Sequence, residues 1–293
     1  MKIRSILVAF ASSILFGCAT TPKFSDVDFP KDDADLTILV TQEELRPEAS
    51  DSSGVVAGGV LLGAVGGLLS AGVAAGIDAE RNARAEDAIE PLRDSLIDYD
   101  LSERFVEHIQ QSRVEERLVV GASPELRTDE LVITDLELDR PLVLLVPEVK
   151  LSNDMMNLLV DLAVTEIAPR ERDGWPIQGM SRTFRFMWPL ETEENLDREE
   201  AVAVWSNHSA EDLMDLIERG MVETLRMMSA HLDEGELAFE DEDSRVHMTE
   251  NERVWLWRES GEFTWLAHTS GRGIVYAVPD HAIIATPRHG YDR

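Results

Sequence analysis

The chain has 293 residues, of which 44% are hydrophobic, so it is long enough for a folded core and is not a disordered acidic tail. Its 27 basic and 57 acidic residues leave a net charge of −30, which argues against nucleic-acid binding and against electrostatic capture by anionic lipids. The single cysteine excludes an intramolecular disulfide and a cysteine-based zinc cluster.

The first 18 residues have the features of an export signal. Lys2 and Arg4 form a short positive region, and an apolar run over residues 6–16 follows, interrupted only by two serines. This run is too short to cross about 30 Å of hydrocarbon, so it predicts a cleaved signal and not a transmembrane helix of the mature protein. The signal ends in the sequence Leu15-Phe16-Gly17-Cys18, in which a small residue precedes the only cysteine.

This ending resembles the lipobox of bacterial lipoproteins. The resemblance implies that residues 1–17 are a signal peptide cut before Cys18, and that Cys18 carries a diacylglycerol and usually a further acyl chain on its amine. Ala19 stands where an aspartate usually marks inner-membrane retention in that family, so the resemblance implies anchoring in the outer membrane with the protein facing the periplasm. The alternative is an ordinary secretory signal that ends by chance in a cysteine.

Two segments of unusual composition follow the signal. Residues 18–53 are rich in Pro, Asp, Ser and Glu and predict a tether with at most one short strand, over residues 36–40. Residues 54–78 begin with 24 uncharged residues, among them eight glycines and five alanines. Small residues recur there every four positions, and on a helix they would form one smooth ridge: Gly59, Gly63, Gly67, Ala71 and Ala75. Such a ridge lets two helices approach closely in lipid.

The ridge resembles the glycine zipper of small outer-membrane lipoproteins, and the resemblance implies association between copies of the chain as a homo-oligomer. A 24-residue helix would be about 36 Å long, enough to cross a bilayer, but eight glycines weaken both its apolarity and its helix propensity. Three interpretations stay open: a membrane-embedded or oligomeric zipper, a helix or hairpin packed on the protein's own sheet, and a flexible linker.

Residues 79–293 predict a periplasmic α+β domain with a mainly antiparallel sheet and amphipathic helices packed on it. Helical spacing of apolar residues covers residues 79–118, with a break at Glu90-Pro91 and a second segment capped by Ser102. A continuous apolar run predicts a strand at residues 142–146, and alternation predicts strands at residues 160–165 and 183–188. A helix over residues 211–232, capped by Ser209, follows, and three or four short strands close the domain.

Motifs that carry chemistry are not found in the sequence. It lacks a G-x-S-x-G elbow, a phosphate-binding glycine loop and a paired-histidine metal motif, so we expect no cofactor and no metal. His208 near Asp212 has the residue types of a base and its orienting carboxylate, although a position beside a helix cap is the simpler explanation. The acidic stretch of residues 233–243 lacks the spacing of a calcium loop and predicts a solvated loop.

Three hypotheses for the function follow, and we prefer the first. It is a lipid-anchored envelope protein that acts as a non-enzymatic structural, assembly or transport-accessory component with an envelope partner. The second is a periplasmic module for a small or lipidic ligand, which an apolar pocket between the sheet and the helix of residues 211–232 would favour. The third is an enzyme, which polar groups converging on a histidine would favour.

Overall fold

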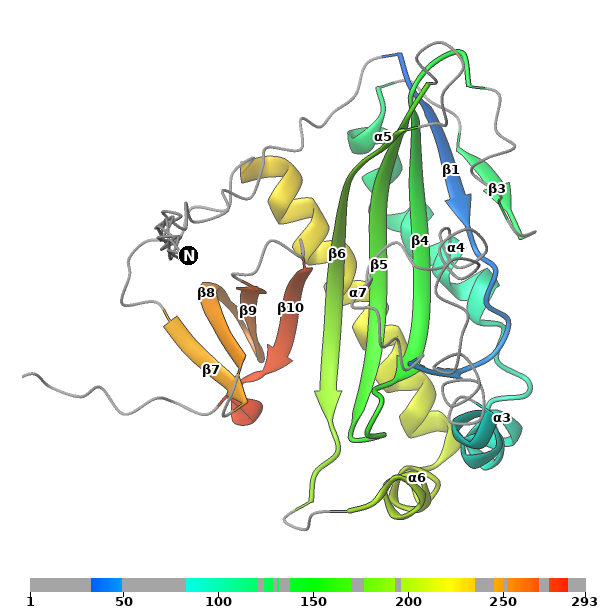
Figure 1. Cartoon of the computed structure of the whole chain (residues 1–293), viewed down its shortest axis with the longest axis vertical. Helices are drawn as coiled ribbons and strands as arrows, with labels where there is room; N and C mark the ends of the chain where they lie inside the picture. Colours follow the sequence, from blue (N-terminus) through cyan, green and yellow to red (C-terminus); the bar gives the residue numbers. More distant parts are fainter. Residues whose placement is uncertain are drawn as a thin grey trace, which may run out of the picture.

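The computed structural model of the chain describes residues 33–48, 83–120, 124–128, 131, 138–169, 177–192, 196–234, 245–249, 252–268 and 274–283 (Figure 1). Its strands are β1 (Asp35–Leu39), β2 (Arg46–Pro47), β3 (Glu125–Arg127), β4 (Leu142–Leu151), β5 (Asn157–Ala168), β6 (Ile177–Pro189), β7 (Arg245–Thr249), β8 (Glu252–Ser260), β9 (Phe263–His268) and β10 (Ile274–Pro279). Its helices are α3 (Glu90–Ser95), α4 (Leu101–Ser112), α5 (Val114–Leu118), α6 (Arg198–Trp205), α7 (Ala210–Glu234) and the 3₁₀ turn η3 (Asp280–Ala282), and residues 83–88 are also helical.

The described strands form one mixed sheet. Nine of them follow the order β3-β1-β4-β5-β6-β10-β9-β8-β7, and β2 pairs with β4 outside this path. The long ladders β4–β5–β6 and the ladders from β7 to β10 are antiparallel, whereas β1 is parallel to both of its neighbours and β10 is parallel to β6. The α+β fold with a mostly antiparallel sheet packed against helices is therefore confirmed.

The alternating strands bury side chains on both faces of the sheet. On one face, Val160 and Leu162 of β5 and Phe186 of β6 belong to the largest apolar cluster, which also includes the buried sides of the helices. On the other face, two smaller clusters form around Leu144 of β4 and Leu266 of β9. A strand that is buried on both faces has few solvent-exposed positions, so its polar side chains need hydrogen-bonding or ionic partners inside the protein.

Helix α7 crosses β5 and β6 on the first of these faces, and α4 and α5 pack beside it (Figure 1). Its predicted start is confirmed: the Ser209 hydroxyl accepts from the Asp212 N–H at 3.1 Å, and the Asp212 carboxylate accepts from the Ser209 N–H at 3.2 Å. The predicted stripe is buried at its centre, where Ile217 and Met221 are 1% and 0% exposed. The helix therefore packs on the sheet because its apolar stripe faces the strands.

Two local predictions in the helical region have different outcomes. The predicted break beside Glu90-Pro91 is confirmed, since residues 83–88 are helical, residue 89 is a turn and α3 begins at Glu90. The predicted cap by Ser102 is wrong: α4 is capped by Asp100, whose carboxylate accepts from the Glu103 N–H at 2.9 Å. Ser102 instead donates to the same carboxylate at 2.8 Å, because it already lies inside the first helical turn.

The predicted tether is too long, because residues 33–48 belong to the folded part. The strand expected over residues 36–40 exists as β1, but it lies inside the sheet, between β3 and β4. Its Leu36 and Ile38 side chains are each 2% exposed, and Leu45 beyond the strand is 3% exposed. These apolar side chains are part of the main cluster, so the segment cannot serve as a free linker.

Candidate functional site

The residues predicted from the sequence to attach lipid or to associate helices lie outside the described residues. These are Cys18 and the ridge residues Gly59, Gly63, Gly67, Ala71 and Ala75. No helix in the described part of the chain combines the length and the hydropathy that a bilayer crossing needs.

His208 does not form a base with Asp212. Its ring Nδ1 lies 3.3 Å from the carbonyl oxygens of Val204 and Trp205, and the ring packs beside Trp205 with centroids 5.4 Å apart. Asp212 is occupied by Ser209, and these hydrogen bonds lower the pKa of its carboxyl. The simpler explanation of His208 as a neighbour of a helix cap is therefore supported by its contacts.

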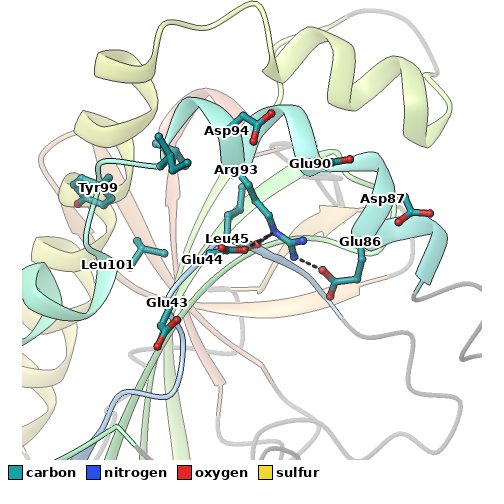
Figure 2. A pocket seen from close by; sticks show the side chains of 12 residues that line it. Glu43, Glu44, Leu45, Glu86, Asp87, Glu90, Arg93, Asp94, Tyr99 and Leu101 are labelled. Atoms are coloured by element: carbon teal, nitrogen blue, oxygen red, sulfur yellow. Dashed lines mark hydrogen bonds and ion pairs between the residues drawn. The ribbon is translucent and has the colours of Figure 1, made fainter.

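A pocket of about 380 Å³ opens between residues 43–45 and the helices that cover residues 83–101 (Figure 2). Twelve acidic, apolar and other residues from both segments line it: Glu43, Glu44, Leu45, Glu86, Asp87, Glu90, Arg93, Asp94, Leu96, Ile97, Tyr99 and Leu101. Six of these twelve residues are acidic, whereas the whole chain has 57 acidic residues in 293. The pocket is therefore far more acidic than the chain as a whole.

Arg93 holds the two walls of this pocket together. Its Nε donates to the Leu45 carbonyl oxygen at 2.7 Å and lies 3.6 Å from the Glu44 carboxylate, while its Nη2 pairs with Glu86. Glu44 precedes the glycine-rich segment in the chain and Glu86 follows it. One guanidinium therefore links the two flanks of that segment across the pocket.

The sequence contains a signal for the acidic residues on the helical side of the pocket. Glu86, Glu90 and Asp94 recur every four residues, and that spacing places side chains on one face of a helix. The sequence gives no comparable signal that residues 43–45 line the pocket, because they fall within the predicted tether and outside the predicted domain.

A second polar cluster lies beside the pocket and centres on Glu218 of α7. The Glu218 carboxylate accepts from the Tyr99 hydroxyl at 2.8 Å and from Arg104 Nε at 2.6 Å, and it pairs with His108 Nε2. Burial raises the pKa of Glu218, but the hydrogen bonds from His108, Arg104 and Tyr99 outweigh this effect and leave the pKa below its ordinary value. Burial and Glu218 together raise the pKa of the Tyr99 hydroxyl.

In the Glu218 cluster the polar groups converge on a carboxylate and not on a histidine, since His108 is one of the three partners of Glu218. All three partners of Glu218 come from the region of α4, and this geometry joins α4 to α7.

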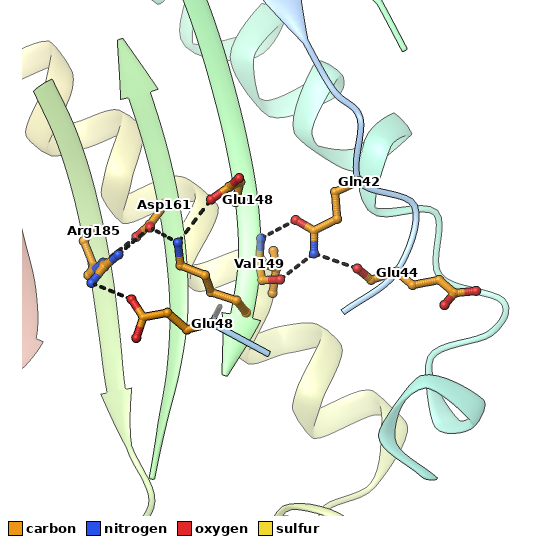
Figure 3. A network of polar contacts seen from close by, with 8 residues as sticks. Gln42, Glu44, Glu48, Glu148, Val149, Asp161 and Arg185 are labelled. Atoms are coloured by element: carbon orange, nitrogen blue, oxygen red, sulfur yellow. Dashed lines mark hydrogen bonds and ion pairs between the residues drawn. The ribbon is translucent and has the colours of Figure 1, made fainter. Parts of the chain in front are cut away.

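The most deeply buried ionic network lies in the centre of the sheet (Figure 3). Arg185 of β6 forms two hydrogen bonds of 2.7 Å with the two carboxylate oxygens of Asp161 on β5, and Lys150 of β4 approaches the same carboxylate at 2.8 Å. Glu148 lies 3.1 Å from Lys150, and Glu48 lies 3.6 Å from Arg185. Burial alone would raise the pKa of Asp161, but Arg185 and Lys150 hold it below its ordinary value.

The segment that follows β1 is held against β4 by a side chain that acts as a strand partner. The Gln42 amide oxygen accepts from the Val149 N–H at 2.7 Å, and its NH₂ group donates to the Val149 and Glu44 carbonyl oxygens (Figure 3). Gln42 is 5% exposed, and it fills the gap between the ladders that β1 and β2 form with β4. Glu48 then joins the ionic network from the end of this segment.

The interface between α7 and the sheet contains little space. The cavity there has a volume of about 10 Å³ and is lined in part by Phe184, Arg182 and His231. Arg182 Nη1 lies 2.7 Å from His231 Nε2, and burial together with the Arg182 charge lowers the pKa of His231 to about 3. This cavity is far below the about 300 Å³ of a typical ligand site, so it does not favour the lipidic-ligand module.

No three His, Cys, Asp or Glu side chains among the described residues are grouped as metal ligands. Comparison with known proteins gives no further guide to the function: no family model matches the chain, and no curated protein or solved structure is significantly similar to it.

Proposed function

We propose that the chain is a lipid-anchored protein of the bacterial outer membrane that faces the periplasm and acts as a non-enzymatic structural, assembly or transport-accessory component. One observation carries the proposal: the only cysteine of the chain, Cys18, follows a positive region and an apolar run and is preceded by the small residue Gly17. Residues 1–17 would be the signal peptide, and the acyl chains on Cys18 would be the membrane anchor. Two or three acyl chains suffice for stable anchoring.

The described fold is compatible with this anchor. Fourteen residues lie between Cys18 and Asp33, where the described part begins, so Asp33 can lie at most about 50 Å from the lipid attachment site. The net charge of −30 opposes adhesion to anionic lipid, so the anchor and not the surface of the protein would supply the membrane affinity.

The glycine-rich segment is the proposed element for association between copies. Its flanks approach the same guanidinium, since Glu44 and Glu86 both contact Arg93. A single crossing of the bilayer would place the two flanks on opposite sides of about 30 Å of hydrocarbon. We therefore favour a hairpin, or a helix that lies beside that of a second copy, with the ridge of Gly59, Gly63 and Gly67 at the contact.

Replacement of the cysteine tests the anchor. Cys18→Ser should block processing of the signal and abolish labelling of the protein by a fatty-acid analogue in bacterial cells, because serine offers no thiol for the thioether bond. In a matched control, Cys18→Ser combined with Thr20→Cys keeps one cysteine in the chain but moves it by two residues. This control should also stay unlabelled, since the lipobox acts by position. Labelling of Cys18→Ser at the level of the original protein would refute the proposal.

A further inference from the structure

Strand β3 forms one edge of the sheet. It pairs with β1 on one side, and no strand of the described part of the chain lies on its other side (Figure 1). It consists of three residues, Glu125, Leu126 and Arg127, and the Leu126 side chain is 51% exposed. The edge of a sheet can pair with a strand of another chain. The backbone and side chains of β3 therefore determine which strand this edge can accept.

The pairing of β3 with β1 shows which backbone groups point away from the sheet. The Arg127 carbonyl oxygen accepts from the Val40 N–H at 2.8 Å, so the backbone groups of Arg127 point towards β1. Successive residues of a strand direct their N–H and C=O groups to opposite sides. The N–H and C=O groups of Leu126 therefore point outward, away from β1.

The sequence of β3 makes this edge complementary to itself. If two copies pair antiparallel about Leu126, this residue lies opposite Leu126 of the second copy, and the two exchange a pair of N–H···O hydrogen bonds. Glu125 then lies opposite Arg127 of the second copy, and Arg127 lies opposite Glu125 of the second copy. Opposite charges on facing residues of neighbouring strands stabilise their pairing, whereas like charges destabilise it.

The side chains also fall on suitable faces. Leu126 lies beside Ile38 of β1, which belongs to the apolar cluster beneath the helices, so Leu126 extends this apolar face to the edge of the sheet. Pairing would cover its exposed side chain with the same side chain of a second copy. Arg127 has an interaction within its own chain as well, but a guanidinium carries five N–H donors and can bind a second carboxylate.

We propose that the edge strand β3 is an interface between two copies of this chain, in which the two β3 strands pair antiparallel about Leu126. Such a contact is symmetric and closes on itself, so it gives a dimer and not a fibre. A ladder of three residues is small, so the contact is reversible. The proposed lipid anchor would raise the local concentration of the copies, but the contact depends neither on the anchor nor on the glycine-rich segment.

Disulfide trapping tests the contact, because it accumulates a weak but specific pairing. With copper phenanthroline as the oxidant, the full-length variant Leu126→Cys in detergent should form a covalent dimer, since residues opposite each other in such a pair have Cα atoms about 5.5 Å apart, within reach of a disulfide. The control Ile97→Cys carries its cysteine at another exposed apolar position, beyond α3 and away from β3 (Figure 1). It should crosslink about tenfold more slowly or less. The original protein measures any crosslink through Cys18.

Charge exchange tests the antiparallel register. In the Leu126→Cys protein, Glu125→Arg and Arg127→Glu should each slow the crosslink about tenfold or more, because each places like charges opposite one another at two positions. The double exchange Glu125→Arg/Arg127→Glu restores opposite charges and should recover most of the rate. The control Glu199→Arg reverses one exposed charge on α6 and should change the rate by less than about twofold.

Three results would overturn the proposal. Absence of a covalent dimer of Leu126→Cys would show that the edge does not meet a second copy, and equal rates for Leu126→Cys and Ile97→Cys would show random collision. Failure of the double exchange to recover the rate would show another register or direction of pairing. Thermal melting checks that each variant folds. If Arg127→Glu does not fold, Glu125→Arg is compared with Glu199→Arg alone, and equal rates for these two would also overturn the proposal.

Discussion

Asp161 shows how strongly a single polar residue depends on its partners in this sheet. It lies on β5 between Val160 and Leu162, it is 3% exposed, and its two oxygens bind Arg185 and Lys150. A buried ion pair gives little net stability compared with apolar packing, but the loss of one member leaves the other charges buried without compensation. The loss of one member of the network should therefore cost much more stability than the intact network adds.

Asp161→Asn should lower the free energy of unfolding by about 3–5 kcal/mol, because it leaves Arg185 and Lys150 buried beside a neutral amide. Denaturant unfolding measures this change. The matched control is Glu116→Gln, which breaks the pair with Arg113 at side chains that are 54% and 71% exposed. That change should cost less than about 1 kcal/mol. Equal effects of the two substitutions would contradict the burial argument.

The lowered pKa of His231 predicts how the stability of the fold depends on pH. Its pKa is about 3 in the folded chain because of burial and Arg182, whereas a free histidine has a pKa near 6.5. Between these values the unfolded chain binds a proton at His231 and the folded chain does not. Its contribution to stability is therefore complete above about pH 6.5 and is lost as the pH falls towards 3.

At pH 5 this loss amounts to about 2 kcal/mol relative to neutral pH. The variant His231→Gln keeps an acceptor for Arg182 but does not titrate. Between pH 7 and pH 5 its free energy of unfolding should therefore fall by about 2 kcal/mol less than that of the original protein. Denaturant unfolding at a series of pH values measures the difference between the two proteins. The same pH dependence in both would show that His231 is protonated normally in the fold.

The crossing of α7 over the sheet depends on one small residue. A Cβ atom at Gly220 would lie 2.6 Å from Val160 Cγ2 and 2.8 Å from Phe186 Cδ1, closer than atoms can pack. Glycine normally weakens the interior of a helix by up to about 1 kcal/mol relative to alanine. Its presence in the middle of a 25-residue helix is therefore explained by the close approach to β5 and β6.

Gly220→Ala should consequently destabilise the protein by about 1–3 kcal/mol despite the better helix propensity of alanine, because the added methyl group pushes α7 off the sheet. Combining it with Val160→Ala removes the nearest contact and should recover part of the loss. A double-mutant cycle of unfolding free energies measures this coupling. Additive effects of the two substitutions would show that the helix does not approach the sheet here.

Elements with a regular apolar pattern could be predicted from the sequence. The apolar stripe predicted α7, and the alternation of apolar and polar residues predicted β5 and β6, because one period repeats over many residues. Helix α6 was not predicted: it has eight residues and no stripe, although the spacing of Asp197 and Glu200 is that of the capping box found in the structure. Strand β1 was expected, but its place inside the sheet was not.

The arrangement of the whole molecule depends on pairings that no local pattern specifies. Strand β1 pairs with β4, and β6 pairs with β10, across long stretches of intervening sequence. Alternation indicates which face of a strand is buried but not which strand lies beside it. For the same reason the pocket was not predicted, since residues 43–45 meet residues 86–101 only when β1 takes its place beside β4.

The position of β1 predicts where the chain can be shortened. Removal of residues 1–32 should leave the fold intact, whereas removal of residues 1–78 should prevent folding. The second change takes away Leu36, Ile38, Leu39, Val40 and Leu45, which are each at most 3% exposed. Their burial contributes on the order of 10 kcal/mol, comparable with the entire stability of an ordinary domain. Circular dichroism and thermal melting of the two fragments measure the outcome, and a cooperative transition in residues 79–293 would contradict it.

The interior place of β1 also bears on the order in which the protein can fold during its synthesis. In the register with β4, Asp35 lies opposite Leu142, 107 residues later in the chain. Synthesis runs from the N-terminus, so the apolar strand exists long before its partner and must wait with its hydrogen-bonding groups unpaired. Closing so long a loop is slow compared with forming a helix or a hairpin. Strand β1 can thus enter the sheet only after β3 and β4 have been made.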